Sequence, residues 1–348
     1  MGKFILRRAS VMLLTAICLT YIVFFLTNLY PNLEKLAKTQ GNFRMTEAEV
    51  QSWLEPRGYL EPMPVKYLEW VGVLPGHLTE LEDGRVLGRC VRPGVEPEDT
   101  PEYCGLLQGK WGFSTVFKEG VGGITFERLG LTGYLMMWVM LVMVPGALIF
   151  GVLAGMREGS RTDRTLSTTS IAFTATPEYV SGVIFIALFA SSAGFGRIFK
   201  GSATSAMESA NFENFFLPVI TIALYGLGYI ARMTRASMAE VMTAQYIRTA
   251  RLKGVSFKNI VLKHALRNAL IAPFTVIMLQ FPWLLNGVVI VETLFNYKGF
   301  GWLLVQAAGN NDIDLLLACS VVAVVVVLVT QLISDIGYVY LNPRIRVA

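Results

Sequence analysis

Six long apolar runs constrain this chain more than any other feature of its sequence. They cover residues 5–29, 131–155, 166–190, 215–233, 269–291 and 315–340. An α-helix rises about 1.5 Å per residue, so about 20 apolar residues span the hydrocarbon core of a bilayer, which is about 30 Å thick. With a mean hydropathy of +0.51 and only 16% charged residues, the chain has more apolar surface than one soluble core can bury. The sequence predicts an all-α membrane protein with six transmembrane helices.

The charged residues between these runs predict the orientation. Residues 232–267 contain eight Lys or Arg and one acidic residue, and Arg157, Arg161 and Arg164 follow the second run. Residues 31–130 instead contain fifteen acidic and eleven basic residues. Because short cytoplasmic loops are rich in Lys and Arg, we expect both termini in the cytoplasm and residues 31–130 outside. Topology then accounts for the net charge of +5, and no nucleic-acid partner is predicted.

This topology divides the chain into four parts. They are an N-terminal tail with the first helix (1–30), a long periplasmic segment (31–130), a five-helix core (131–340) and a cytoplasmic tail (341–348). Pro31 predicts the end of the first helix. In the periplasmic segment, Thr46 and Glu49 predict a capping box, a second amphipathic helix is expected around residues 65–71, and the Gly- and Pro-rich residues 75–112 predict a loop.

The cytoplasmic loop at residues 235–268 has the pattern of a helix, a glycine turn and a second helix. Residues 238–253 predict a helix that ends at Gly254, which takes the left-handed conformation at little cost, and Ser256 can cap the next helix. The small Thr249 and Ala250 allow close approach, so this elbow is suited to docking a partner. The alternative is that the basic residues only keep the loop inside and that Gly254 only ends a helix.

The order of residues in 246–273 resembles the EAA loop of ABC-importer permeases, in the form typical of the oligopeptide, dipeptide and nickel class. Ala250 and Gly254 match the general pattern, whereas Arg248 and Thr249 stand where that pattern has Glu and Ala. These departures are typical of the peptide branch. The resemblance therefore favours that branch of the family.

The resemblance extends over nearly the whole chain. His264 and Arg267 replace a later Ile and Pro of the general pattern, as they do in the peptide branch. Further matches lie at residues 4–8, 64–70, 291–301 and 342–346, whereas residues 75–110 look longer than the usual outer loop of the family.

The resemblance implies the type I ABC-importer permease fold in a bacterial inner membrane. It implies three kinds of partner: a homologous second permease, two cytoplasmic ABC ATPase subunits, and a periplasmic substrate-binding protein. The ATPase-coupling residues would be Arg248, Thr249, Ala250, Arg251, Lys253 and Gly254. ATP and Mg would be bound by the ATPase subunits, and this chain would bind no cofactor. Di- or oligopeptides are favoured as substrates by frequency within the family, with nickel complexes, oligosaccharides and opines as alternatives.

The sequence offers no pattern for an enzyme. The nearest approach to a Walker A motif ends in Gly109-Lys110, but Cys104 stands where the first Gly should be and Trp111 replaces Ser or Thr. The two histidines, His77 and His264, lie in predicted loops, which disfavours histidine-dependent chemistry in the membrane, and no cluster has metal-ligand spacing. A stand-alone secondary carrier or channel is the alternative class, and a membrane scaffold is a third. The elbow discriminates, because a carrier driven by an ion gradient needs no ATPase dock.

Polar residues in or near the runs are candidates for the translocation path, because polar groups in a bilayer are costly and often functional. They are Glu178 after Pro177, and Gln280 and Asn286 around Pro282; Asp335 lies near the inner end of the last run. Helix packing or satisfied kinks are the alternative for each.

Two of the four cysteines, Cys90 and Cys104, lie in the predicted periplasmic segment. An oxidising periplasm would permit a disulfide between them. Cys18 and Cys319 lie within runs and are expected to be small apolar residues.

Overall fold

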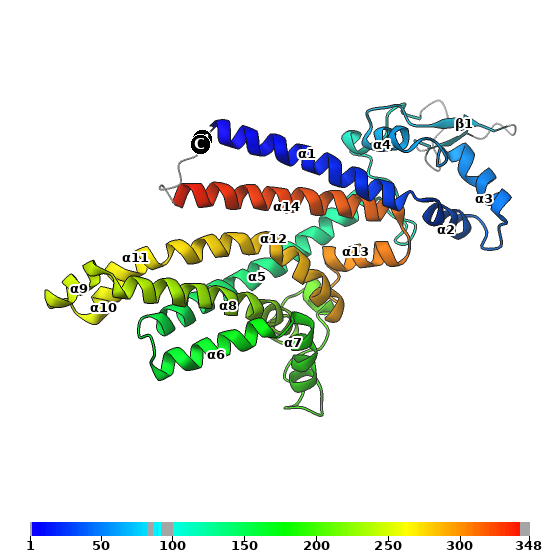
Figure 1. Ribbon diagram of the computed structural model, residues 1–348. Coiled ribbons are helices and arrows are strands. Elements are labelled where there is room, and N and C mark those ends of the chain that lie inside the picture. The colour runs from blue at the N-terminus through cyan, green and yellow to red at the C-terminus, as the bar shows by residue number, and fades with distance from the viewer. Residues whose placement is uncertain (1, 82–85, 89, 92–99, 342–348) are drawn as a thin grey trace. The chain divides into compact units, whose positions relative to one another are not determined.

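The computed structural model is mainly helical and describes residues 2–81, 86–88, 90–91 and 100–341 (Figure 1). The predicted tail at 341–348 lies outside these residues except for Leu341. The chain forms two compact units. We call the first the core unit (Met1–Ala9, Leu129–Trp302 and Val326–Ala348) and the second the α1–α4 unit (Ser10–Arg128 and Leu303–Val325).

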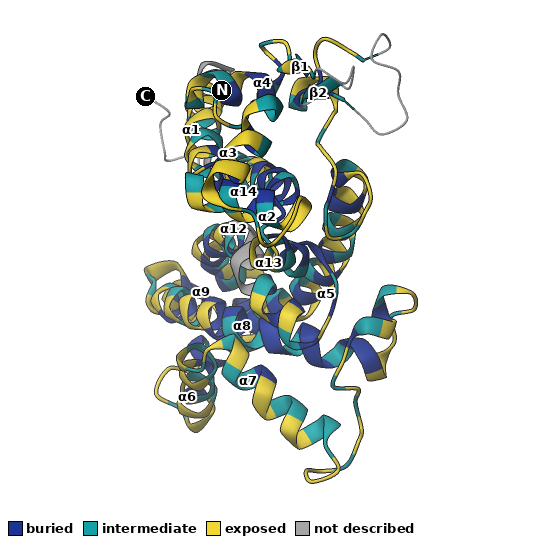
Figure 2. Cartoon of the chain, turned by 90° about the vertical axis from the view of Figure 1, so that its right-hand side faces the viewer, coloured by how far each residue is buried: buried dark blue, intermediate teal, exposed yellow. Residues whose placement is uncertain are grey.

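Within the described residues, four helices are long and apolar enough to cross a membrane, and two bent helix pairs would raise the number to six. The four are α1 (Gly2–Thr27), α5 (Val121–Gly155), α8 (Phe212–Thr243) and α14 (Ile313–Leu341). The bent pairs are Arg161–Ala175 with Glu178–Ala190, at 101°, and Phe257–Ala269 with Ile271–Gln280, at 52°. Much of α1 is exposed (Figure 2). Its exposed residues include apolar ones such as Leu13 and Leu14, as expected of a helix that faces lipid.

The run at 166–190 is not one helix, contrary to the prediction. α6 (Arg161–Ala175) ends before Thr176, and α7 (Glu178–Phe185) begins after Pro177 and continues as a π-helical turn at Ile186–Ala190. The residue before a proline is pushed out of the helical region, and Thr176 is extended with φ −96° and ψ 117°. Pro177 therefore explains the break and was a signal for it.

In the core unit, α6 and α12 (Ile271–Leu294) each pack against α8, and α5 contributes to the same apolar core (Figure 1). Their shared apolar core includes Leu135, Val139, Met143, Ile222 and Ile230. Close packing depends on a missing Cβ at Gly228, because a methyl group there would strike the carbonyl oxygen of Ser170 on α6. Small residues at helix contacts are typical of membrane bundles.

Short helices complete the core unit. They are α9 (Gln245–Leu252), α10 (Phe257–Asn259), a π-helical segment (Ile260–Ala265), α11 (Leu266–Ala269) and α13 (Phe300–Gly309), whose first three residues belong to this unit. Figure 1 shows α9, α10 and α11 together at one end of α8.

The α1–α4 unit contains more regular structure than predicted. Its helices are α2 (Tyr30–Gln40), α3 (Glu47–Leu54) and α4 (Met63–Val71), with 3-10 turns at Glu55–Arg57 and Leu106–Gln108. The capping box of Thr46 and Glu49 and the second amphipathic helix are confirmed. As predicted, α1 ends before Pro31, at Thr27. Pro31 itself lies in the first turn of the next helix, α2, where its missing N–H is not needed.

The predicted loop at 75–112 contains a small hairpin. β1 (Leu78–Glu80) pairs antiparallel with β2 (Val86–Gly88), with Leu78 opposite Gly88. The core of the α1–α4 unit combines apolar residues from its N-terminal helices and from α14, namely Phe24, Leu33, Leu36, Val50, Leu54, Trp70, Ile313, Leu317 and Val321. Tertiary packing thus gives residues 31–130 an ordered interior that local sequence signals only partly predicted.

Candidate functional site

The sequence of the predicted cytoplasmic loop folds into the predicted elbow, with one added break. The predicted helix at 238–253 is divided at Ala244, which is extended at φ −65° and ψ 149° and separates α8 from α9. The break turns α9 so that its Ile247 packs with Met238 and Met242 of α8. Packing against α8 therefore decides the path of the chain here.

The turn at Gly254 has the predicted left-handed conformation, with φ 76°. The amide of Gly254 donates to the carbonyl oxygen of Arg251 at 3.0 Å, and the amide of Val255 donates to that of Ala250 at 3.1 Å. A Cβ on Gly254 would meet no atom within 4 Å, so glycine is needed for its backbone conformation and not for space. Ser256 is the residue before α10, but its side chain makes no capping hydrogen bond within the described chain.

The interior of the elbow is an apolar cluster, against which Val152 of α5 and Met156, just after α5, also pack. Its buried residues are Met238, Met242, Ile247, Ala250, Ile260, Val261, Ala265 and Ala269. Ala250 is only 9% exposed, so its small side chain lets the elbow helices approach each other. By contrast Arg248, Thr249, Arg251 and Lys253 are exposed. The elbow thus has an apolar interior and a basic outer surface.

Leu252 is a residue of the elbow that the predicted set lacks. It is 82% exposed at the end of α9, between Arg251 and Lys253. The buried face of α9 is formed by Ile247 and Ala250, three residues apart, and Leu252 lies off this helical face. That spacing was a sequence signal for its exposure. We call residues 248–254 the elbow tip.

The predicted path residues are not gathered into one site by the structure. Glu178 is half-buried at the first position of α7, directly after the break, and Gln280 is buried in α12. Among the described side chains these two share no hydrogen bond. The side chain of Asn286 lies outside the described residues. Asp335 pairs with Arg8 at 3.4 Å (Oδ2 to Nε).

The end of α12 holds a buried carboxylate, Glu292, that sequence reasoning missed. Its Oε1 accepts a hydrogen bond from the hydroxyl of Thr132 on α5, and its Oε2 accepts one from the amide of Trp302 at 3.0 Å. The hydroxyl oxygen of Thr132 in turn accepts the amide of Phe300 at 2.8 Å. Glu292 comes directly after the apolar run 269–291 and is followed by Gly299 and Gly301, but its partner Thr132 is distant in sequence. We call residues 292–302 the α12–α13 turn.

A family profile described as "binding-protein-dependent transport system inner membrane component" matches residues 147–347, which is more than half of the chain. The chain belongs to this family. It is therefore an integral inner membrane permease of an ABC importer, a class of transport protein that works with ATPase and binding-protein partners.

Curated relatives resemble this permease over most of its length. A probable peptide ABC transporter permease of Sinorhizobium fredii (strain NBRC 101917 / NGR234) is 30% identical over 99% of this chain and 100% of that protein. An oligopeptide transport system permease of Bacillus subtilis (strain 168) is 30% identical over 87% of each chain. A glutathione transport system permease of Escherichia coli (strain K12) is 32% identical over 69% of this chain and 76% of that protein.

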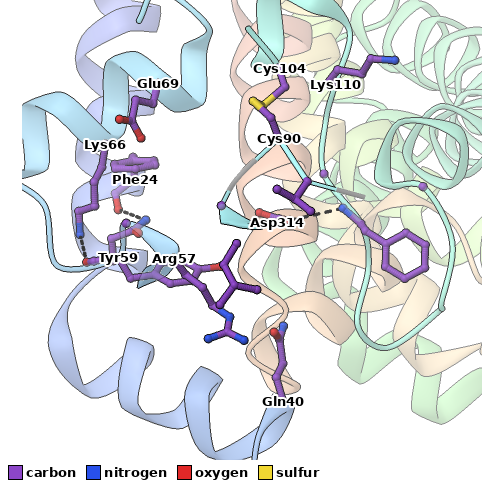
Figure 3. A pocket seen from close by; sticks show the side chains of 18 residues that line it. Phe24, Gln40, Arg57, Tyr59, Lys66, Glu69, Cys90, Cys104, Lys110 and Asp314 are labelled. Carbon is purple, nitrogen blue, oxygen red and sulfur yellow. Dashed lines mark hydrogen bonds between the residues drawn. A yellow bond between two sulfur atoms is a disulfide. The ribbon is translucent and has the colours of Figure 1, made fainter. Parts of the chain in front are cut away.

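The α1–α4 unit of the permease contains a disulfide beside an open cleft. Cys90 and Cys104 are bonded with a Cα–Cα distance of 5.4 Å (Figure 3). The cleft has a volume of about 880 Å³, and its charged lining residues are Arg57, Lys66, Glu69, Lys110 and Asp314. The ammonium group of Lys66 donates to the carbonyl oxygen of Tyr59 at 2.8 Å, and burial lowers the pKa of Lys66. Within the described ranges, no His, Cys, Asp and Glu residues gather into a metal-binding group.

Proposed function

We propose that this permease pairs with a homologous second permease and encloses a path for di- or oligopeptides, driven by two cytoplasmic ATPase subunits. The relatives support the substrate class, because their names refer to peptide, oligopeptide and glutathione transport. None of these names supports a nickel complex, an oligosaccharide or an opine. Glu178, Gln280 and Asn286 remain our candidates for residues along the path.

We further propose six membrane spans with both termini in the cytoplasm. The two bent helix pairs would supply the third and fifth spans. Residues 31–130 would then be periplasmic and residues 131–340 would be the five-helix core, with the coupling loop at 235–268 and a tail at 341–348. The disulfide between Cys90 and Cys104 supports the periplasmic position, since disulfides persist in oxidising compartments.

The elbow tip is the proposed ATPase dock. One observation carries this proposal: the apolar interior of the elbow is buried, yet Leu252 is 82% exposed among basic residues. A strongly exposed apolar side chain on a rigid element suits insertion into a partner pocket, and Tyr246, Phe257 and Leu262 of the elbow are less exposed than Leu252, at 43%, 38% and 52%. Arg248, Thr249, Arg251 and Lys253 would contact the ATPase, Gly254 would set the turn, and Ala250 would support it from inside. Nucleotide bound to the ATPases with Mg would favour one packing of the permease helices over another.

The test is to replace Gly254 with Gln and purify the complex from membranes. We expect loss of ATPase co-purification and of ATP-driven trialanine uptake, because a bulky residue at φ 76° is strained and covers the tip. Gly109→Gln is the matched control, since Gly109 also has a left-handed φ of 69° and open space around its Cβ. Unchanged association and uptake in Gly254→Gln would refute the dock at the elbow tip and place the ATPase contact elsewhere on the permease.

The substrate class is tested separately with the unmodified complex. Unlabelled trialanine in excess is expected to compete with labelled trialanine for uptake, whereas nickel–histidine, maltotriose and octopine are not. Uptake of one of these three compounds without trialanine uptake would refute the peptide assignment and leave the ATPase dock unaffected.

A further inference from the structure

The carboxylate of Asp163, near the start of α6, is almost completely buried, with 3% of the residue exposed. Both of its oxygens accept hydrogen bonds from Arg235 of α8. Oδ1 accepts one from Nε at 3.0 Å, and Oδ2 accepts one from a terminal guanidinium nitrogen at 2.9 Å. The amide of Gly159 and the hydroxyl of Ser167 donate to the same carboxylate at 2.8 Å and 3.0 Å. Four donors and a paired fork make this one of the strong arrangements for an ion pair, here between a buried carboxylate and a partly exposed guanidinium.

The same end of α8 is attached to the elbow. Ser237, two residues after Arg235, donates its hydroxyl to the carbonyl oxygen of Ala269 at 2.8 Å. Ala269 is the last residue of α11 and belongs to the elbow interior. Arg235 therefore holds α6 to α8, and Ser237 holds the elbow to α8 two residues further along.

The connection between α5 and α6 also contacts the elbow directly. The guanidinium of Arg157 lies 5.2 Å from the ring centroid of Phe257, the first residue of α10, which is a cation–π distance. Glu158 in the same connection lies 3.3 Å from a guanidinium nitrogen of Arg235. The connection is thus fixed to α8 at Arg235 and to the elbow at Phe257.

α6 is the half of the broken span that these contacts hold. It leads into the bend at Pro177, and α7 beyond the bend packs on α8 and α12, where Gly182 has no room for a Cβ beside Leu294 and Thr221. With a rigid attachment at the start of α6, a movement of the elbow would therefore be transmitted along α6 to the bend at Pro177. Without that attachment, α6 would be held to α8 by packing alone, as at Gly228 and Ser170.

We propose that the Asp163–Arg235 ion pair is the positioning contact that makes α6 move together with α8 and the elbow during the transport cycle. This proposal rests on the proposed ATPase dock, because the elbow must first be driven by a partner. Neither residue touches substrate. Their function is to keep the distance between α6 and the elbow constant while the helices repack as units.

The experiment measures that distance in the purified complex with its ATPase subunits. Spin labels are attached to Thr168→Cys on α6 and Lys263→Cys in the elbow, both at exposed positions, in a Cys18→Ala, Cys319→Ala background. Pulsed electron paramagnetic resonance is recorded without nucleotide and after trapping with ADP and vanadate. We expect one narrow distance in both states for the parent and a broadened, shifted distance on trapping for Asp163→Asn.

Arg235→Lys is the second variant, because it keeps the charge and removes the paired fork. It is expected to broaden the trapped-state distance less than Asp163→Asn and to lower trialanine uptake per ATP hydrolysed by about fivefold. Arg232→Lys is the matched control, since Arg232 is exposed one turn earlier on α8, and it should behave as the parent does.

A structural role alone would lower the yield of folded complex without a distance change that depends on nucleotide. The proposal is overturned if trapping changes the parent distance, or if both variants keep the parent distribution in both states. If Asp163→Asn fails to assemble, the distance distribution of Arg235→Lys in the trapped state tests the proposal. Absence of ATPase subunits from the parent complex would refute the dock instead.

Discussion

Two glycine turns of the core unit are built in opposite ways. At the elbow tip, Gly254 has φ 76° and open space out to 4 Å where a Cβ would stand, and the neighbouring Leu252 is 82% exposed. In the α12–α13 turn, a Cβ on Gly299 would lie within 3.0 Å of both Glu292 and Thr132. The first turn needs glycine for its backbone angle, and the second needs it for close packing.

This difference separates a turn suited to a partner from one completed within the chain. The α12–α13 turn satisfies its amides with the buried Glu292 and Thr132, and Tyr297 donates its hydroxyl to the carbonyl oxygen of Leu131 at 2.9 Å. Apart from Ala250, the elbow tip leaves its side chains in solvent. Substitutions in the α12–α13 turn should therefore affect stability, and substitutions in the elbow tip should affect association.

The largest expected effect is that of Glu292→Ala. It leaves the buried hydroxyl of Thr132 and the amide of Trp302 without their acceptor and opens a cavity, so we expect a loss of about 2–4 kcal/mol in unfolding free energy. Thermal unfolding of the purified complex measures it. Asp335→Ala is the control, because its ion pair with Arg8 is partly exposed and of little value. Equal melting temperatures for Glu292→Ala and Asp335→Ala would contradict a stabilising role for the α12–α13 turn.

A smaller stability effect is expected from Gly299→Ala, at about 1–3 kcal/mol from overpacking. Gly254→Ala should cost about 1 kcal/mol, since only the left-handed backbone disfavours the methyl group. Denaturation of both variants in detergent gives the order. A larger loss for Gly254→Ala than for Gly299→Ala would show that we have assigned the two roles of glycine wrongly.

For Leu252→Asp we expect little change in stability, because the side chain is exposed. ATPase association should weaken about tenfold, as for a central apolar anchor of an interface. The affinity is measured by titrating purified ATPase subunits onto the permease in nanodiscs. Leu107→Asp is the control, since Leu107 is 70% exposed in the α1–α4 unit. Equal affinities for both variants would remove Leu252 from the dock.

The smallest effect is expected for Arg251→Gln, about a twofold loss of ATPase affinity. Exposed charge pairs contribute little and are screened by salt, so the loss should vanish at high ionic strength. The same titration at low and high salt measures it. A salt-independent loss would indicate that Arg251 contacts the ATPase by packing.

The turns and breaks of the fold differ in whether the local sequence predicts them. The turn at Gly254 and the capping box at Thr46 were predictable because each depends on neighbouring residues. Pro177 was a local signal for the broken span that the apolar composition of 166–190 obscured. The break at Ala244 had no such signal, since packing of α9 on α8 decides it.

The candidate functional residues also differ in whether the local sequence reveals them. The basic elbow residues were recognisable from their order, and the exposure of Leu252 from helical spacing. Glu292 and Asp163 were not, because their partners Thr132 and Arg235 are distant in sequence. Such pairings become visible only in the folded chain.

The central claim is that the elbow tip faces the cytoplasm and is covered by an ATPase, and Leu252→Cys tests it most directly. In a Cys18→Ala, Cys319→Ala background, a membrane-impermeant maleimide is applied to inside-out vesicles and to spheroplasts, with and without the ATPase subunits. Phe43→Cys, at a 77% exposed site of the α1–α4 unit, is the control. We predict labelling of Leu252→Cys only in inside-out vesicles and its protection by the ATPase subunits, with Phe43→Cys labelled only in spheroplasts. Labelling of Leu252→Cys in spheroplasts, or labelling that the ATPase subunits leave unchanged, would contradict the account.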